Sequence, residues 1–427
     1  MSITVVGAGF AGCEAAYILA ENGVKVKLYE MKPKYKSAAH SVDLFAELVC
    51  SNSFKASRLD SAAGLLKWEM QKLGSVCVKT ALKTSVPAGG ALAVDRNEFS
   101  SQITDIIKNH KNIEVIHKKV DTIPQDDYVI IATGPLTDGE LAENIKKLVG
   151  CDYLNFFDAA APIVTAESVD FNKVFSASRY EQTVGDYFNC PFNREEYLEF
   201  HNELVNAESV IVKDFDVYEG CMPIEVLAKR GTDAIRFGPM KPVGLINPAT
   251  GHRPWAAVQL RKENSSGTLF NLVGFQTNLK FGEQKRVFSM IPGLENAEFV
   301  RYGVMHRNSF IDSPRLLNAD FSLKEKPNVY FAGQISGVEG YMESAMSGLV
   351  SGISVLNKLN GKKPIEFPDF TMIGALCGYI SDSTVKNFQP MGANYGVIPS
   401  LCERIKDKRE RYARLSDRSV KWYEREI

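Results

Sequence analysis

The segment at residues 5–30, VVGAGFAGCEAAYILAENGVKVKLYE, constrains the fold more than any other part of the chain. Gly7, Gly9 and Gly12 have the spacing G-x-G-x-x-G, after a short apolar strand and at the start of a helix expected over residues 11–22. In such a unit the first glycine allows a tight turn, the second lets backbone amides approach a pyrophosphate, and the third lets the helix pack closely on the strand. The helix N-terminus faces the phosphates. The segment therefore predicts a dinucleotide-binding βαβ unit.

An acidic residue follows where this interpretation requires one. Glu30 ends the second expected strand, residues 25–29, and lies 18 residues after Gly12. A carboxylate at this position can accept hydrogen bonds from a ribose diol. The glycine spacing alone is a weak signal, and a tight turn in another kind of βα unit is the alternative. The strand, the helix and the acid together favour the dinucleotide site.

Two later segments bear on the choice between FAD and NAD. Residues 128–135, YVIIATGP, and residues 328–333, NVYFAG, both read as buried strands that end in glycine. The second is followed by a glycine-rich turn and a helix expected over residues 341–356. A strand, a glycine and a helix N-terminus late in the chain resemble the second FAD contact of two-dinucleotide-type flavoproteins, in which the helix dipole faces the flavin. This pattern favours FAD.

The fold class expected from these segments is α/β, a Rossmann-like FAD-binding domain interrupted by an α+β insertion domain. Residues 1–150 and 325–400 form the discontinuous FAD-binding domain in this interpretation. Residues 151–324 have fewer long apolar runs and more aromatic and charged residues, and they are expected to form the insertion domain. Residues 401–427 carry nine Lys and Arg against six Asp and Glu and predict a charged C-terminal helix.

Composition narrows the class of protein. The net charge is −1, so any binding of nucleic acid must come from a local basic patch. No segment is apolar over the length that spans a membrane, and no secretory signal is visible, so a cytoplasmic location without a membrane partner is expected. The eight cysteines include no C-x-x-C pair and no zinc-like cluster, so no metal site is expected and the thiols should be reduced.

Two of the cysteines stand in unusual contexts. Cys50, in ELVCSNSFK, lies between an apolar run and a polar cluster that suits a helix start or a turn. Cys221, in YEGCMPIE, lies in a turn marked by glycine and proline, with basic residues close behind it. Thiols near helix N-termini or cationic side chains are more readily deprotonated. A reactive thiol and a structural thiol both remain open for each position.

A third stretch, YGVMHRNSFIDSP, places His306, Arg307 and Asn308 after an apolar strand. A histidine ring can stack on a planar ligand, and arginine or asparagine can pair with the ligand's polar edge. A hydrogen-bonded core histidine is the alternative.

Basic and aromatic residues alternate in the insertion, which suits RNA but also describes many solvated surfaces.

Taken together, several motifs resemble one family, the folate- and FAD-dependent tRNA (uracil-5-)-methyltransferases. The resemblance covers nearly the whole chain in order, and CSNSFK and EGCMP are its most specific motifs. The larger FAD proteins that modify the tRNA wobble uridine share the glycine motifs but have several hundred more C-terminal residues. The motifs that carry the resemblance are VVGAGFAGCEAA, ELVCSNSFK, YEGCMPIEVLAKRG, RFGPMKPVGL, VQLRKEN, YGVMHRNSFI and FAGQISGVEGYMESAMSGL.

The resemblance implies that the chain makes 5-methyluridine in the tRNA T-loop. The one-carbon donor would be 5,10-methylenetetrahydrofolate, with FAD as methylene carrier and NADH or NADPH as the reductant of the flavin. Cys221 would be the nucleophile and Cys50 the base or partner thiol. His306 would stack on the pterin, with Arg307 and Asn308 nearby. The residues implied in FAD binding are Gly7, Gly9, Gly12, Glu30, Gly134, Gly333, Gln334 and Gly340.

Three questions stay open at this point. A uridine of 23S ribosomal RNA could replace tRNA as the substrate, because the reacting base would be the same. A flavin oxidoreductase acting on a small molecule would explain the glycine motifs but not the two motif cysteines. A non-catalytic RNA-binding partner that keeps its FAD site would bind RNA without methyl transfer. The oligomeric state and the choice between NADH and NADPH have no sequence signal.

Overall fold

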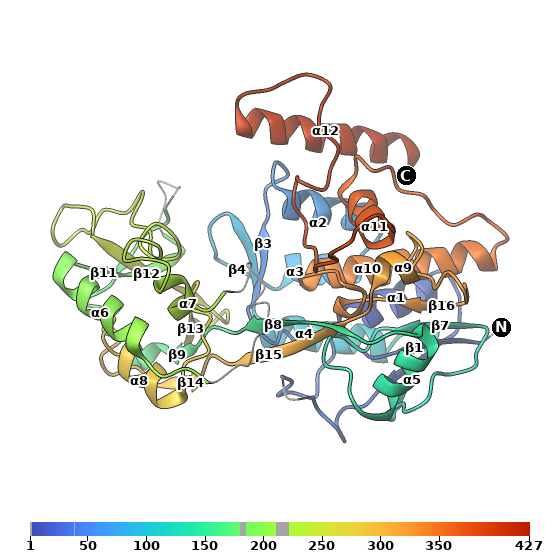
Figure 1. Ribbon diagram of the computed structural model, residues 1–427, viewed down its shortest axis with the longest axis horizontal. Coiled ribbons are helices and arrows are strands. Elements are labelled where there is room, and N and C mark those ends of the chain that lie inside the picture. Colours follow the sequence, from blue (N-terminus) through green and yellow to red (C-terminus); the bar gives the residue numbers. More distant parts are fainter. Residues whose placement is uncertain (1, 38, 180–184, 211–221) are drawn as a thin grey trace.

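A five-stranded parallel sheet lies at the centre of the larger domain (Figure 1). The computed structural model describes residues 2–37, 39–179, 185–210 and 222–427. The strands in spatial order are β16 (Val329–Phe331), β7 (Tyr128–Ile131), β1 (Ile3–Val6), β2 (Val26–Glu30) and β6 (Ile113–His117). β16 pairs with β7 although nearly half of the chain separates them. One sheet therefore joins the beginning and the later part of the chain, which confirms the predicted Rossmann-like class.

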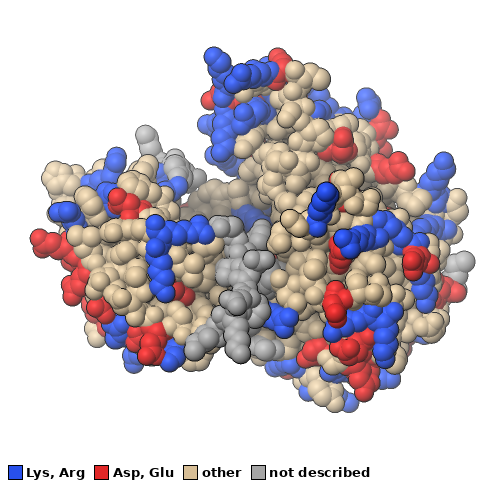
Figure 2. Space-filling model, in the orientation of Figure 1, with Lys and Arg blue, Asp and Glu red and all other residues tan. Residues whose placement is uncertain are grey.

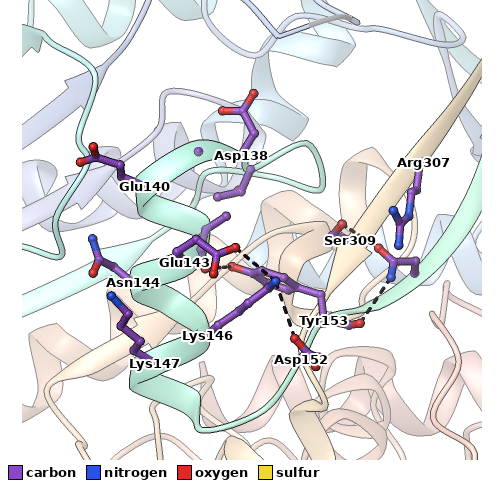
Figure 3. A pocket seen from close by; sticks show the side chains of 14 residues that line it. Asp138, Glu140, Glu143, Asn144, Lys146, Lys147, Asp152, Tyr153, Arg307 and Ser309 are labelled. Atoms are coloured by element: carbon purple, nitrogen blue, oxygen red, sulfur yellow. Dashed lines mark hydrogen bonds and ion pairs between the residues drawn. The ribbon is translucent and has the colours of Figure 1, made fainter.

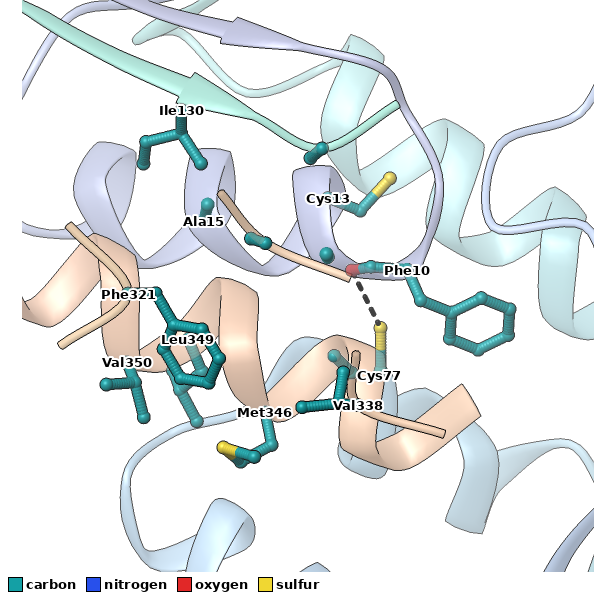
Figure 4. Close-up of a cluster of buried hydrophobic side chains, with 14 of the residues drawn as sticks. Phe10, Cys13, Ala15, Cys77, Ile130, Phe321, Val338, Met346, Leu349 and Val350 are labelled. Carbon is teal, nitrogen blue, oxygen red and sulfur yellow. Dashed lines mark hydrogen bonds between the residues drawn. The ribbon is translucent and has the colours of Figure 1, made fainter. Parts of the chain in front are cut away.

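Helices α1 (Phe10–Glu21) and α10 (Tyr341–Leu359) pack against each other in the core of this domain (Figure 4). Their backbones approach so closely that a Cβ atom on Gly348 would lie 2.0 Å from the carbonyl oxygen of Ala11. Only glycine allows such an approach. The first helix and the late helix therefore form a close-packed pair at the centre of the domain.

The insertion has its own antiparallel sheet and its own core. The strands in spatial order are β10 (Phe175–Ser176), β11 (Tyr187–Phe192), β12 (Ala256–Lys262), β13 (Leu269–Leu272), β9 (Ile163–Thr165) and β14 (Phe299–Arg301). Val258, Leu260, Phe270 and Leu272 point into this core from β12 and β13. Helices α6 (Arg194–Asn206), α7 (Ile224–Ala228) and α8 (Phe281–Phe288) contribute further apolar side chains to this core. Because side chains alternate along a strand, the intervening polar residues face the opposite side of the sheet.

A two-stranded ribbon connects the two domains. Strand β8 (Leu154–Ala159) leaves the FAD-type domain, and β15 (Met305–Phe310) returns to it antiparallel to β8. Phe310 and Phe321 pack in the core of the larger domain, not in that of the insertion. The expected end of the insertion at residue 324 is therefore too late: residues 310–324 follow the ribbon back because their apolar side chains complete the larger core.

The remaining elements surround these two sheets (Figure 1). A small sheet consists of β3 (Ser53–Ala56), β5 (Ala91–Val94) and β4 (Ser85–Val86). The other helices are α2 (Ala62–Lys72), α3 (Val76–Lys83), α4 (Arg96–Lys108), α5 (Gly139–Val149), η1 (Ala166–Ser168), α9 (Ser313–Leu316), η3 (Gln334–Ser336), α11 (Met372–Ser381) and α12 (Lys408–Glu426). Among the described helices, none combines the length and the apolarity needed to cross a membrane.

The C-terminal helix α12 is fixed to the larger domain by buried polar contacts. The Ser416 hydroxyl donates to the carbonyl of Leu59, and the Ser419 hydroxyl donates to the Glu69 carboxylate at 2.6 Å. The same carboxylate accepts backbone N–H groups of Met372 and Ile373 at the start of α11. One buried side chain therefore holds two C-terminal helices onto α2.

Candidate active site between the two domains

The first cavity has a volume of about 420 Å³ and lies at the C-terminal edge of the parallel sheet. This edge is where ligands bind in open α/β sheets. Its walls come from the glycine loop after β1, the end of β2, the segment at residues 31–50, the loop after β7 and the start of α10. The cavity is therefore built from both ends of the chain.

The three motif glycines differ in what a side chain would meet at each position. Gly7 has a φ of +99°, and a Cβ atom there would lie 2.5 Å from the carbonyl oxygen of Ala132. A Cβ atom on Gly12 would lie 1.8 Å from the Gly7 carbonyl oxygen. Gly9 differs, because no heavy atom lies within 4 Å of its Cβ position. Its open side faces the first cavity, which fits the close approach of a pyrophosphate.

Glu30 is buried at the end of β2 and connects two parts of the cavity wall. Its Oε2 accepts the N–H of Ala8 at 2.8 Å, and its Oε1 accepts the N–H of Lys32 at 2.9 Å. Each carboxylate oxygen has a further lone pair for a ligand hydroxyl. Glu30 thus shapes the glycine loop in addition to the ribose contact that the sequence predicts.

The later cofactor residues divide between two cavities. Gly134, Gly333 and Gln334 line the first cavity. Gly340 lines a neighbouring second cavity, and a Cβ atom on it would lie 2.2 Å from Oε2 of Glu343. Its glycine identity follows from a φ of +121° and from this buried carboxylate. The structure therefore groups Gly340 with the second cavity and not with the dinucleotide cradle.

The second cavity has a volume of about 250 Å³ and lies between the larger domain and the insertion sheet. It shares Val49, Cys50, Gln334 and Tyr341 with the first cavity. Residues from β12 and β13 close its other side. Cys50 consequently lies in the wall that the first cavity shares with the smaller second cavity.

Tyr341 holds Cys50 directly. The N–H of Cys50 donates to the Tyr341 Oη at 2.8 Å, and the Cys50 Sγ lies 3.0 Å from the same oxygen. Because the amide already donates to Oη, the phenol hydrogen is available to donate to the sulfur. Desolvation, with the nearby Cys50 as the next cause, raises the pKa of Tyr341 well above its ordinary value, so the hydroxyl keeps this hydrogen. Such a donor stabilises a thiolate more than a thiol.

Two arginines hold the backbone just before Cys50. The Arg96 guanidinium donates to the carbonyl of Leu48, and the Arg301 guanidinium donates to the carbonyl of Val49. Burial and then the charge of Arg96 lower the pKa of Arg301. Both guanidinium groups lie near Cys50, where positive charge favours an anionic sulfur, and the buried carboxylate of Glu263 pairs with Arg96 at 2.9 Å.

A third arginine comes from the insertion sheet and holds the backbone just after Cys50. Arg261 on β12 is buried, and burial lowers its pKa. Its Nε donates to Asn52 Oδ1 at 3.0 Å, and its Nη2 donates to Ser51 Oγ at 2.9 Å. The insertion therefore fixes the cysteine loop from across the domain boundary.

The three residues of the predicted folate site lie on β15, and the side chains of Arg307 and Asn308 face different cavities. Asn308 is buried and lines the first cavity. Arg307 and Ser309 line a separate open hollow beside α5, with Lys146 and Tyr153 (Figure 3). Alternation along the strand explains the split, since neighbours point to opposite faces. The backbone of His306 pairs with that of Asp158, and its side chain lies outside the described part of the structure.

The predicted nucleophile, Cys221, lies outside the described residues. The described chain resumes with Met222, which is buried. The N–H of Ile224 donates to the carbonyl of Gln276 at 2.7 Å, and Gln276 lines the second cavity. The segment that follows Cys221 is therefore attached next to the smaller cavity.

Four other cysteines belong to the cores. Cys13 on α1 and Cys77 on α3 flank the helix crossing, where Cys77 donates to the carbonyl of Phe10 (Figure 4). Desolvation raises the pKa of both thiols well above the ordinary value, as it does for Cys190 and Cys377. A buried neutral thiol is unreactive. These four thiols are therefore buried and unreactive, whereas Cys50 is only partly buried and lines a cavity.

Tyr341, Arg96 and the second cavity were not predicted from the sequence. Tyr341 does follow the glycine-rich turn at the start of a predicted helix, which was the available signal. Its contact with Cys50 depends on how α10 packs on the glycine loop, and the sequence does not contain that information locally.

A parallel sheet with a glycine cradle and an inserted antiparallel sheet defines the class of Rossmann-type flavoproteins. Residues 2–363 match the family model of glucose inhibited division protein A. The structure of Aquifex aeolicus GidA superposes with a TM-score of 0.71 over 99% of this chain and 73% of that chain, at 17% identity. At this identity the likeness shows the fold alone.

Full-length relatives specify the family. A methylenetetrahydrofolate–tRNA-(uracil-5-)-methyltransferase TrmFO of Acetivibrio thermocellus is 59% identical over 98% of this chain and 97% of its own length. The protein of the same name from Fusobacterium nucleatum is 54% identical over 100% of this chain and 98% of its own length. The chain belongs to the TrmFO family.

Proposed function

We propose that the protein methylates C5 of a uridine in tRNA, with 5,10-methylenetetrahydrofolate as the one-carbon donor. The single observation that carries the proposal is the position of Cys50 in the wall shared by a dinucleotide cradle and a smaller cavity. The names of the full-length relatives support the folate donor and the tRNA substrate. FAD is the dinucleotide that the first cavity would hold, through Gly9, Glu30 and Gly333.

The chemistry needs a thiolate close to the flavin. Bound FAD, once reduced, carries the one-carbon unit and supplies the electrons that complete the methyl group. Uracil C5 is a poor nucleophile until a thiolate adds to C6, and a base must later remove the C5 proton. We assign the addition to Cys221 and the proton removal to Cys50. The hydroxyl of Tyr341 and the charges of Arg96 and Arg301 support a Cys50 thiolate that could accept that proton.

The folate and the reductant complete the proposal. Asn308, buried in the wall of the first cavity, would bind the pterin edge, and His306 would stack on its ring. NADH or NADPH would reduce the flavin. Arg307 faces the open hollow beside α5, where a guanidinium suits an anionic group such as the glutamate tail of the folate (Figure 3).

The RNA partner must be bound through local basic surfaces, since the net charge is only −1. Several basic residues of the insertion are poor candidates, because Lys280 pairs with Glu208 and Arg286 pairs with Glu203. Lys and Arg side chains gather instead over the N-terminal half of α12, on the side towards the insertion (Figure 2). We propose α12 as a phosphate-binding surface.

The test is transfer of radiolabel from 5,10-methylenetetrahydrofolate with FAD and NAD(P)H present. Unmodified tRNA and an unmodified 23S rRNA fragment would be offered separately. Label in tRNA alone supports the proposal. Label in rRNA alone keeps the chemistry and changes the substrate. If NAD(P)H is oxidised but neither RNA is labelled, the proposal is wrong and a small-molecule oxidoreductase takes its place.

A pair of variants tests the roles of the thiols. Cys221→Ala should keep the yellow flavin and lose methylation. Cys13→Ala is the matched control, because Cys13 is buried in α1 and donates only to the carbonyl of Ala8. A wild-type methylation rate in Cys221→Ala would remove that residue from the role of nucleophile.

A further inference from the structure

One side chain in the wall of the second cavity lacks a protein partner. Asn271 on β13 is 3% exposed, and its Nδ2 has no hydrogen-bond partner among the described residues. Leaving a buried amide donor unpaired destabilises the folded state. Buried polar groups are usually satisfied, so such an exception calls for a partner that is missing when the site is empty. Asn271 lines the second cavity, which is where that partner would bind.

The sheet explains why Asn271 faces the cavity. Its neighbours Phe270 and Leu272 point into the insertion core, so strand alternation turns Asn271 to the opposite face. There it lies directly across from Arg261 in the pairing of β13 with β12. Both residues line the cavity beside Cys50.

The chemistry of this pair selects a ligand with a carbonyl oxygen. A guanidinium has only donors, and an amide offers a donor and an acceptor side by side. The part of the cavity beside Arg261 therefore favours a ligand group that accepts hydrogen bonds. Uracil presents O4 as an acceptor next to N3–H as a donor, whereas cytosine presents an amino group where uracil has O4. The cavity, at about 250 Å³, is below the usual range for drug-sized ligands and suits a single base.

We propose that Asn271 reads the uracil ring of the RNA substrate, with Nδ2 donating to O4 and Oδ1 accepting from N3–H. The inference rests on the proposed uridine substrate and adds the residue that identifies the base. When a thiolate adds to C6, negative charge develops on O4, and donors already placed there stabilise it. Asn271 therefore contributes both to the choice of base and to the reactivity of the ring.

If Asn271 binds the base, replacing it should change RNA binding and leave the thermal stability of the protein intact. Asn271→Leu removes the unpaired amide and nearly keeps the side-chain volume, so the variant should retain flavin and melt at or above the wild-type temperature. If Asn271 is instead a structural residue, the same substitution should lower the melting temperature. Asn264→Ala is the matched control, since Asn264 is a half-buried asparagine in the turn between β12 and β13 and does not line the second cavity.

The deciding experiment measures equilibrium binding of T-arm stem-loop RNAs to the flavin-loaded, full-length protein at fixed salt. The target position carries uridine, 4-thiouridine or an abasic site. Wild type and Asn264→Ala should prefer uridine over the abasic RNA by about tenfold or more, and 4-thiouridine should bind more weakly than uridine because sulfur is a weak acceptor. Asn271→Leu and Asn271→Ala should bind uridine and 4-thiouridine equally.

Each outcome bears on the inference. If 4-thiouridine weakens binding by the same factor in wild type and in both Asn271 variants, Asn271 does not contact O4 and the inference is overturned. A wild type that does not distinguish uridine from the abasic RNA overturns it as well. A wild type that discriminates through Asn271 but transfers no label from methylenetetrahydrofolate leaves the base-reading role in place and refutes the proposed reaction.

Discussion

The hydroxyl oxygen of Tyr341 lies 3.0 Å from the sulfur of Cys50, although 291 positions separate the two residues in the chain. The contact forms because α10 begins beside the glycine loop and packs along α1. Cys50 therefore receives its hydrogen-bond donor from the first residue of α10, and its position depends on the assembly of the whole larger domain.

Tyr341→Phe removes this donor without changing the ring. We expect methylation to slow by about tenfold, the effect of losing a hydrogen bond to a charged group, while flavin content stays the same. Peptide mapping should show slower alkylation of Cys50 by iodoacetamide, because a smaller fraction of it is thiolate. Tyr379→Phe, which removes a hydroxyl bonded to the carbonyl of Gln389, is the control. An unchanged alkylation rate in Tyr341→Phe would contradict this role.

Gly9→Ala and Gly12→Ala should fail in different ways. The Cβ of Gly12→Ala would meet the Gly7 carbonyl oxygen at 1.8 Å, so the apoprotein should be destabilised by several kcal/mol. The Cβ of Gly9→Ala meets no heavy atom within 4 Å, so the apoprotein should melt normally but retain much less flavin. Melting curves and flavin absorbance measure both effects. Equal melting losses in the two variants would show that Gly9 is constrained by the fold and not by the ligand.

Glu69 should make stability depend on pH. Desolvation raises its pKa from 4.5 to about 7, so the folded state binds a proton that the unfolded state releases. This contribution is full below pH 4.5 and is lost as the pH rises through 7. Glu14 has the same shift from the same cause. Glu69→Gln should therefore flatten, without abolishing, the fall in melting temperature between pH 5 and pH 8. A slope identical to wild type would mean that Glu69 is already ionised in the folded protein.

The basic half of α12 should control RNA affinity. Lys408 and Arg411 are exposed, and replacing both with alanine should weaken tRNA binding several-fold and reduce the salt dependence of binding by about one to two phosphate contacts. Flavin content should not change. Replacing the exposed pair Lys362 and Lys363, which follow the far end of α10, is the matched control. An equal loss of tRNA affinity in both variants would show that the net charge of the protein controls binding, and not a particular surface on α12.

Local patterns predicted much of the fold because they depend on neighbours in the chain. The glycine spacing before α1, the acid at the end of β2 and the late strand followed by a helix each identify an element without knowledge of its partners. The end of the insertion was misplaced, because the residues after β15 join a core whose other members lie far away in sequence. For the same reason the sequence does not reveal that Gly340 lies beside the buried carboxylate of Glu343, and its contact with the cofactor stays a prediction.

The sequence by itself determined the dinucleotide cradle and singled out Cys50, since both depend on residue types within a few positions of one another. Only the tertiary structure decided what surrounds that cysteine. Arg96, Arg261, Arg301 and Tyr341 come from four separate elements, and each acts on the cysteine loop through a contact that no sequence interval encodes. Electrostatic and hydrogen-bond energies depend on distance in space, and folding alone sets those distances.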